Sequence, residues 1–361
     1  MSSSLAALVR RLTPVIAAVA IFASILQLLG YQGLDVLGDI FRGSLGGPNA
    51  ALQSLRWSLP LTIMGLGAAI SFRTGFFNVG GLGQFYFGAI AATAVATNLV
   101  GVSPLVAIPA SVLAAMLAGA LWSLLPGVLR VYWGADEVVT TIMANFVAQF
   151  LMLYLLSGPM MDRSSATAQG AASAPIAAEF RISTSSGISA ATVLITLLVI
   201  AAVWLLATRT SFGVLSAIAG RNGIMLAWQG VRVKRIGLQA FGVSGALAGL
   251  AGAMEILGPS GKLVAGLSPQ LGNNAMLVAL VAGLAIFGSV FAALFFGALT
   301  AASLFLPIAS QLPASAVVVL NGLIAILVTA QFRFSGRSAR RRSRSAVESV
   351  NSPGDKAGAR K

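Results

Sequence analysis

Long apolar segments fill most of this chain, and they decide what it can fold into. Runs that approach or exceed the length needed to cross roughly 30 Å of bilayer hydrocarbon occupy residues 12–29, 51–71, 85–100, 105–129, 138–157, 189–208, 237–258, 273–288, 290–306 and 315–332. Lipid offers no hydrogen bonds to a backbone, so such segments cross a bilayer as helices. The sequence predicts an all-α polytopic membrane protein of about ten transmembrane helices, with the eighth and ninth separated near Gly288.

Composition excludes a soluble enzyme. Hydrophobic residues make up 57% of the chain and charged residues only 9%, which is too few charges to cover the surface of a soluble fold of this length. The 40 glycines suit membrane helices, whose backbones pack closely through small residues. Cysteine and histidine are absent. We therefore expect no disulfides, no catalytic residues and no metal site.

The placement of basic residues predicts the orientation of the chain. Near the ends of the expected helices, 15 basic residues lie on the side that carries both termini and 5 on the other side. Positive charge accumulates on the cytoplasmic side of membrane proteins, so both termini are expected in the cytoplasm. The first run follows Arg10 and Arg11, as in a signal peptide, but it is long and no cleavage site precedes the polar segment at 32–39. A retained helix is the better interpretation.

The domain organisation is simple. Residues 1–332 are expected to form one transmembrane domain, and residues 333–361 a basic, disordered cytoplasmic tail with little to bury. Despite the net charge of +14, we expect no nucleic-acid partner, because arginines beside a membrane helix bind anionic lipid more simply. The longest segment expected outside is 158–188.

Polar residues interrupt the apolar pattern at three places. Residues 70–84 carry four glycines and a charge between two long apolar runs. Such a segment either breaks a helix beside a solute route or forms a tight turn with closely packed glycines. Residues near 209–236 form the long cytoplasmic connection, in which Ile224, Trp228 and Val231 share a helical face. A short amphipathic helix there needs membrane or a partner protein.

The third place begins at Asp136 and Glu137, where a helix is expected to start and carboxylates interact favourably with its dipole. Thr141, Asn145 and Gln149 follow at intervals of four residues and share one face. That stripe either lines a polar path or forms hydrogen bonds between helices, the commoner case.

Glu255 is the one carboxylate within an expected span, about one turn from its outer end. A single carboxylate without histidine argues against a proton-coupled pump. The chain also lacks the phosphate-binding loop of ATPases, since Gly261-Lys262 has neither the spaced first glycine nor a following Ser or Thr.

Together these stretches resemble the permease subunits of bacterial ABC importers in the branched-chain amino acid, ribose and nucleoside permease family, above all its simple-sugar and nucleoside members. The resemblance rests on ISFRTGFFNVGGLGQ at 70–84, EVVTTIMAN at 137–145, the cytoplasmic loop at 220–235 and SGALAGLAG at 244–252, and it extends from about residue 50 to 332. Two departures stand out. Leu82 replaces an acidic residue of the family, and residues 223–226 replace Pro-Glu-Ala-Ala.

The resemblance implies an import complex in which this chain binds no cofactor and partner ATPase subunits bind Mg-ATP. Its other expected partners are a second permease, in a homo- or heterodimer, an extracytoplasmic substrate-binding protein and the lipid of the bacterial inner membrane. The loop at 209–236 is expected to couple to the ATPase through Gly220, Arg221, Asn222, Trp228 and Gly230.

The substrate is expected to be a nucleoside or simple sugar. Neutral polar solutes need amide-type partners, so we expect Asn78, Gln84, Asn145, Gln149 and Glu255 to line the solute pathway. The alternatives are a branched-chain amino acid importer and a stand-alone secondary transporter or channel.

Overall fold

The computed structural model describes residues 3–163, 171–183 and 188–328, with side chains from residue 13 onward. The expected tail at 333–361 lies outside the described residues. Within them the fold is helical, and the extended pairing consists of two isolated bridges, Met161 with Ser173 and Ala172 with Val264.

Most helices follow one another with short connections, and the long one lies between α6 and α7. They are α1 (Ser3–Leu28), α2 (Gly33–Leu45), α3 (Pro48–Arg73), α4 (Gly81–Asn98), α5 (Pro104–Trp133), α6 (Glu137–Ser157), α7 (Ala190–Arg209), α8 (Ser211–Trp228), α9 (Val233–Glu255), α10 (Pro269–Val281), α11 (Ile286–Ala309) and a last apolar helix, Ser315–Val328. A 3-10 turn, η1 (Ala178–Phe180), and a π-helical turn, η2 (Ile256–Ser260), complete the set.

The chain divides into two compact units. One comprises residues 1–33 and 318–361 and so contains α1 and most of the last helix. The other, residues 34–317, contains the remaining helices. In the first unit α1 buries Ala18, Phe22 and Leu26, which recur every four residues and therefore share one face. Every candidate site residue named above lies in the second unit.

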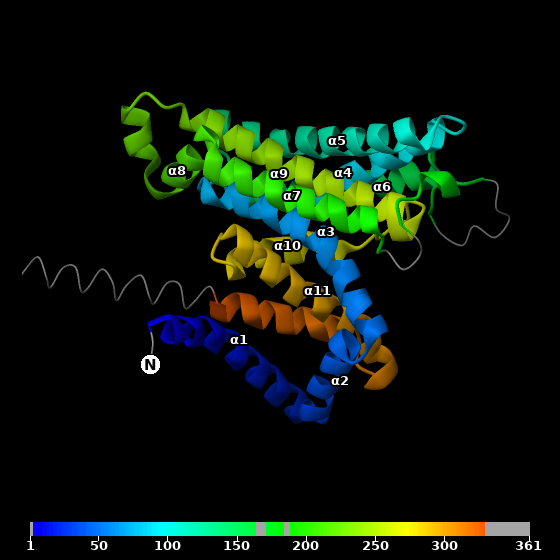
Figure 1. Ribbon diagram of the computed structural model, residues 1–361, viewed down its shortest axis with the longest axis vertical. Coiled ribbons are helices and arrows are strands. Elements are labelled where there is room, and N and C mark those ends of the chain that lie inside the picture. Colours follow the sequence, from blue (N-terminus) through cyan, green and yellow to red (C-terminus); the bar gives the residue numbers. More distant parts are fainter. Residues whose placement is uncertain (1–2, 164–170, 184–187, 329–361) are drawn as a thin grey trace, which may run out of the picture. The chain divides into compact units, whose positions relative to one another are not determined.

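Within the second unit α3 and α9 form the centre. In each, 83% of the most apolar stretch is buried, whereas α5, α6 and α7 bury only 22% of theirs. α9 contacts α3, α4, α5 and α8, while α3 also packs against α7, α10 and α11. In Figure 1, α4, α5 and α9 run side by side, with α8 at one end of the group. We call this the α8 end, and the opposite end of α9, where η2 follows, the η2 end.

Glycines let α9 approach its neighbours closely. A side chain at Gly249 would overlap the backbone of Ala115 in α5, and one at Gly88 in α4 would overlap the backbone of Gly249 itself. A side chain at Gly119 of α5 would overlap the Gly245 carbonyl oxygen and lie 2.9 Å from the Gly249 backbone. Small residues are the usual means by which helix backbones approach each other in membranes. The family-like segment at 244–252 thus forms the contact surface of α9.

The helical character of the predicted runs is confirmed, since each of the ten falls on a helix. Six helices of the described part are long and apolar enough to cross a membrane: α3, α5, α6, α7, α9 with η2, and α11. Those six support a polytopic membrane protein. The number of ten spans and the cytoplasmic placement of both termini stay predictions.

Two local expectations need correction. The boundary predicted near Gly288 is wrong, because α10 ends at Val281 and the turn occupies residues 282–285. There Gly283 and Leu284 adopt φ values of 60° and 62°, a left-handed conformation that ends a helix. The segment at 32–39, which looks polar in sequence, lies largely in α2, whose Val36 and Ile40 are buried.

The glycine contact gives a direct prediction. Gly249→Ala should lower the melting temperature of the detergent-solubilised protein, since overpacking at a close contact costs about 1–3 kcal/mol. Gly242→Ala on the same helix is the matched control, because a Cβ there meets only a methyl group of Leu124 at 3.9 Å. Equal melting temperatures for the two variants would contradict the close packing of α9.

Candidate functional site

The segment at 70–84 contains the end of α3, the connection at 74–80 and the start of α4. α3 ends at Arg73, where the Thr74 hydroxyl donates to the Ser71 carbonyl at 2.6 Å. Gly75 then takes a φ of 82°, which glycine adopts without strain. The Ser71 hydroxyl donates to the Phe76 carbonyl at 2.8 Å. Residues 74–80 therefore form an ordered connection tied back to the last turn of α3.

Two buried amides anchor this connection. The Asn78 Nδ2 donates to the Gln84 Oε1 at 3.1 Å, and the Gln84 Nε2 donates to the Asn78 Oδ1 at 2.8 Å. Asn78 also donates to the Ser244 hydroxyl of α9 at 3.1 Å and accepts from the Gly80 N–H at 3.0 Å. The pair joins the connection to α4 and α9. Its hydrogen bonds offset the cost of burying two amides.

Asn145 reaches the same connection from α6. Its Oδ1 accepts from the Gly83 N–H at 2.8 Å, and its Nδ2 donates to the Val79 carbonyl at 3.2 Å. The Gly83 amide belongs to the first turn of α4, where N–H groups lack partners within the helix. A Cβ at Gly83 would lie 3.0 Å from the Asn145 Oδ1 and 2.9 Å from the Trp122 Nε1. Asn145, on α6, thus supplies a hydrogen-bond acceptor that the first turn of α4 lacks.

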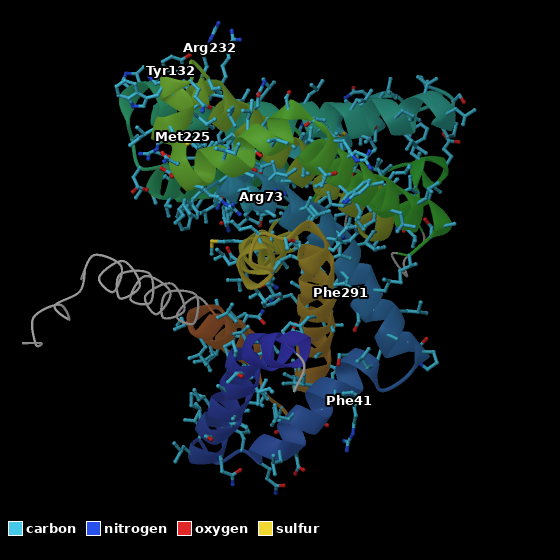
Figure 2. The ribbon with its side chains drawn as sticks, turned by 60° about the vertical axis from the view of Figure 1, so that its left-hand side comes forward. Phe41, Arg73, Tyr132, Met225, Arg232 and Phe291 are labelled. Carbon is cyan, nitrogen blue, oxygen red and sulfur yellow. The ribbon has the colours of Figure 1, made fainter. Side chains whose placement is uncertain are left out.

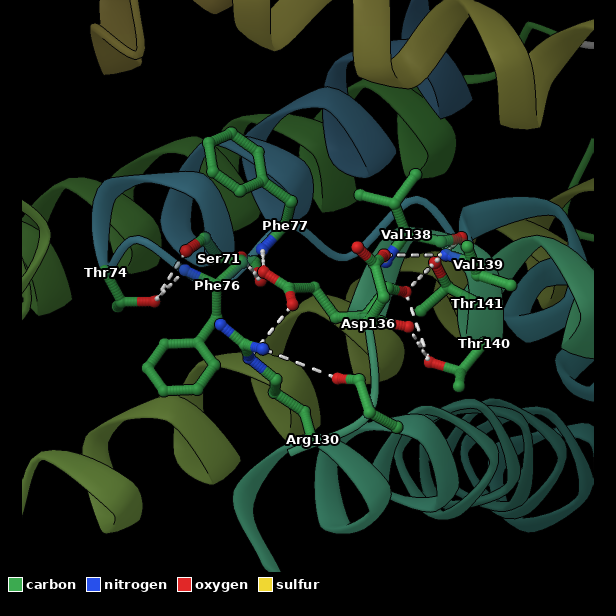
Figure 3. A network of polar contacts seen from close by, with 12 residues as sticks. Ser71, Thr74, Phe76, Phe77, Arg130, Asp136, Val138, Val139, Thr140 and Thr141 are labelled. Carbon is green, nitrogen blue, oxygen red and sulfur yellow. Dashed lines mark hydrogen bonds and ion pairs between the residues drawn. The ribbon is translucent and has the colours of Figure 1, made fainter. Parts of the chain in front are cut away.

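Figure 3 shows Arg130, at the end of α5, and Phe77, in the connection, and the Glu137 carboxylate bonds to both. This carboxylate pairs with the Arg130 Nε at 2.9 Å and accepts from the Phe77 N–H at 3.5 Å. Asp136 is the N-cap of α6 and accepts from the N–H groups of Val138 and Val139. The helix start expected at these two carboxylates is confirmed, and Asp136 caps it. For Glu137 capping is insufficient, because this buried carboxylate also forms an ion pair.

The connection at 209–236 contains a longer helix than predicted. α8 changes direction at Asn222, with φ −154° and ψ 79°, and the Asn222 Oδ1 accepts from the Met225 N–H at 3.0 Å. Asn222 is thus the N-cap of the final stretch, 223–228. Ile224 and Trp228 are 75% and 85% exposed on that stretch. Figure 2 shows Met225, Tyr132 and Arg232 in the upper left of the view.

Val231 does not belong to the helical face predicted for it. α8 ends at Trp228, because Gly230 takes a φ of 79° and the Val231 N–H donates back to the Leu226 carbonyl at 3.0 Å. This explains Gly230 as a helix terminator. Arg221 is exposed. A side chain at Gly220 would overlap the Arg73 carbonyl, so α8 packs directly against the turn that follows α3.

Gln149 and Glu255 lie apart from the amides of the connection. Gln149 is exposed on α6, roughly 6 Å beyond Asn145 along the axis. Glu255 is the last residue of α9, roughly 16 Å from Ser244 by helical rise. The structure thus brings Asn78, Gln84 and Asn145 together and leaves the other two elsewhere. That a solute touches these five residues stays a prediction.

Sequence reasoning missed the partners of the buried charges. Arg56 donates to the Glu255 Oε1 at 2.7 Å, and Arg130 pairs with Glu137. A signal existed for the first pair. Arg56 lies within the run at 51–71 and Glu255 within that at 237–258, and ionisable residues in membrane spans commonly pair with each other.

The two amides of α6 give a matched test. Asn145→Ala should lower the melting temperature of the solubilised protein, because it leaves the Gly83 N–H and the Val79 carbonyl unpaired at a cost of about 1–3 kcal/mol. Gln149→Ala should leave stability near wild type, since the described residues give Gln149 no hydrogen bond. A larger loss for Gln149→Ala than for Asn145→Ala would show that this assignment is wrong.

Comparison with known proteins gives a consistent result. Residues 50–329 match the family described as the permease component of branched-chain amino acid transport systems. The chain is 30% identical over 88% of its length to the glucose ABC transporter permease protein of Haloferax volcanii and covers 86% of that protein. It is 30% identical to the guanosine ABC transporter permease protein of Bacillus subtilis, over 89% of this chain and 92% of the relative.

A nucleoside ABC transporter permease protein of Lactococcus lactis is also 30% identical, over 80% of this chain and 82% of the relative. No solved structure matches. Because the family match covers the whole second unit beyond α2, it includes the connection, α6, α8 and α9 described above. The chain therefore belongs to the family of permease components of branched-chain amino acid transport systems, and it is a membrane-spanning permease subunit of an ABC importer.

Proposed function

We propose that this subunit imports a neutral polar solute, a nucleoside or a simple sugar, across the bacterial inner membrane by alternating access. The main observation behind this proposal is that three relatives with 30% identity over most of the chain are named for glucose, guanosine and nucleosides. The interior supports this choice. Buried polar groups at the connection include the amides of Asn78 and Gln84, which suit hydroxyl and base groups better than a charged solute.

The proposal includes separate partners for energy and selection. Cytoplasmic ATPase subunits bind Mg-ATP, because the chain has no phosphate-binding loop of its own. A second permease, identical or related, completes the membrane part, and an extracytoplasmic protein delivers the solute. The chain itself is not an enzyme. Lipid surrounds the exposed apolar faces of α5, α6 and α7.

In this proposal the α8 end faces the cytoplasm. Basic residues gather there at the ends of α3, α5 and α7, within α8 and at the start of α9, and they include Arg73, Arg130, Arg209, Arg221, Arg232, Lys234 and Arg235. Cytoplasmic ends of membrane helices are enriched in such residues. The η2 end, with residues 171–183, then faces outward.

Coupling follows from the contacts of α8. Its final stretch exposes Ile224 and Trp228 to a partner, while Gly220 packs against the Arg73 carbonyl. A movement of α8 driven by the ATPase subunits therefore reaches the connection at 74–80. Through Asn78 that connection is hydrogen-bonded to α4 and α9. We propose that Asn78, Gln84, Asn145, Gln149 and Glu255 line the solute route.

Transport measurements test the substrate. The subunit should be purified with its partners, reconstituted in liposomes and supplied with labelled uridine, guanosine, glucose and leucine. We expect ATP-dependent uptake of a nucleoside or of glucose. Uptake of leucine alone would refute the proposed solute class and favour a branched-chain amino acid importer. Uptake without ATP or ATPase subunits would instead indicate a stand-alone transporter.

Trp228 tests the coupling role of α8. Trp228→Asp should uncouple ATP hydrolysis from uptake, because loss of an exposed aromatic anchor commonly costs an interface about 2 kcal/mol or more. Trp228→Phe keeps an aromatic anchor and should retain coupling. The ratio of solute imported to ATP hydrolysed, normalised to folded complex, measures the effect. An unchanged ratio for Trp228→Asp would remove this residue from the coupling surface.

Orientation can be tested directly, because the chain contains no cysteine. A membrane-impermeant thiol reagent should label Glu179→Cys in intact spheroplasts and should label Arg221→Cys only after permeabilisation. Both residues are exposed in the structure, so access within the protein does not distinguish them. The reverse pattern would invert the proposed topology.

A further inference from the structure

A buried ion pair joins α3 to the far end of α9. The Arg56 Nη2 lies 2.7 Å from the Glu255 Oε1, and the two side chains are only 13% and 4% exposed. The Ser260 hydroxyl donates to the same carboxylate oxygen at 3.1 Å. The Arg56 guanidinium lies over the Trp57 ring at 3.8 Å. This pair connects two helices through residues 199 positions apart.

The backbone beside the pair is irregular. Glu255 directly precedes η2, a π-helical turn in which Gly258 has φ −108° and ψ −119°. π-helical turns are rare and are often found at functional sites. Arg181, from the segment 171–183, donates to the carbonyls of Gly258 and Pro259 at 3.1 and 3.3 Å. The Ile182 N–H donates to the Leu257 carbonyl at 2.7 Å. The extended segment therefore covers the end of α9.

Polar groups around the pair are incompletely satisfied. Among the described residues, the Trp57 Nε1, the Arg181 Nε and the Ser183 hydroxyl are buried without a hydrogen-bond partner. A small cavity of about 10 Å³ lies against Arg56 and Glu255, bounded on its other sides by residues that include Leu59 and Thr192. It is large enough for about one water molecule. Buried polar groups are normally paired, so such a cluster is a place where water or a second arrangement of the helices can supply partners.

Stability alone does not account for this ion pair. Removing a guanidinium and a carboxylate from water costs several kcal/mol for each ion, and their attraction commonly only balances that cost. An apolar pair at the same place would hold the helices as well. What an ion pair adds is reversibility, because both groups are readily hydrated when the helices separate.

We propose that the Arg56–Glu255 pair is a latch at the η2 end of the solute route: it joins α3 and α9 in the conformation described here and opens during the transport cycle. The proposal rests on the proposed function of the subunit as an alternating-access importer. When the latch opens, water enters the cavity beside Leu59 and hydrates both charges. Arg56 keeps its contact with the Trp57 ring, while Glu255 keeps the Ser260 hydroxyl. The solute then passes between separated ends of α3 and α9.

Thiol labelling tests the latch. Leu59→Cys places the chain's single thiol in the cavity behind the pair, where Leu59 is 7% exposed. In complexes held in lipid nanodiscs, a water-soluble maleimide should label this thiol at rates that differ roughly tenfold or more between the nucleotide-free and the vanadate-trapped states. A tenfold change corresponds to about 1.4 kcal/mol in the opening equilibrium. Equal rates in the two states would overturn the proposal.

Charge variants separate a latch from a structural bond. In the Leu59→Cys background, Glu255→Gln should give fast labelling in both states and so remove the difference between them. The exchange Arg56→Glu with Glu255→Arg should restore it. Glu179→Gln, an exposed carboxylate on the segment that covers η2, is the matched control and should behave like the parent. If Glu255→Gln only lowers the melting temperature and keeps the parent's state dependence, the pair is structural and the latch is wrong.

The labelling result is independent of the solute class. A complex that imports leucine, and so contradicts the proposed solute, can still show state-dependent labelling at Leu59→Cys. A complex that imports nucleosides or glucose without such labelling contradicts the latch alone.

Discussion

The close backbone contact of α9 with α4 and α5 is the constraint on which the other contacts depend. At Gly249 the space between helices is too small for any side chain. This contact fixes α9 relative to the start of α4, and it lets Ser244 receive a hydrogen bond from Asn78. The same helix carries Glu255 at its far end. A single rigid element therefore links the amides near the α8 end to the charge pair near the η2 end.

Where the backbone is not regularly helical, side chains from neighbouring elements form hydrogen bonds with its N–H and C=O groups. In the connection at 74–80, Asn145 donates a hydrogen bond to the Val79 carbonyl, and Glu137 accepts one from the Phe77 N–H. At the η2 end, Arg181 donates hydrogen bonds to two carbonyls of η2. Irregular backbone in a membrane protein needs such partners, since lipid supplies none. Both irregular segments are thus held by side chains from distant parts of the sequence.

Hydropathy predicted where the helices lie because burial in lipid depends on local sequence. It predicted the turn near Gly288 wrongly, because Ala282–Ala285 is as apolar as its surroundings and only the left-handed conformation of Gly283 and Leu284 ends the helix. A local sequence pattern does not predict which distant residues form hydrogen bonds or ion pairs with each other. Asn78 meets Ser244 across 166 positions, and Arg56 meets Glu255 across 199. The sequence showed that these polar groups were costly but not which group would pair with which.

The residue at position 82 bears both on the packing of α4 against α10 and on the charge of the proposed solute. The resemblance expects an acidic residue there, yet Leu82 is 9% exposed and lies against Gly272 at the start of α10. A carboxylate at that position would need a partner of opposite charge or a raised pKa to remain buried. The charged residues buried within the described part are Glu137 and Glu255, and each has an arginine partner. With leucine at position 82, this contact between α4 and α10 stays apolar, which agrees with the proposed solute that carries hydroxyls but no net charge.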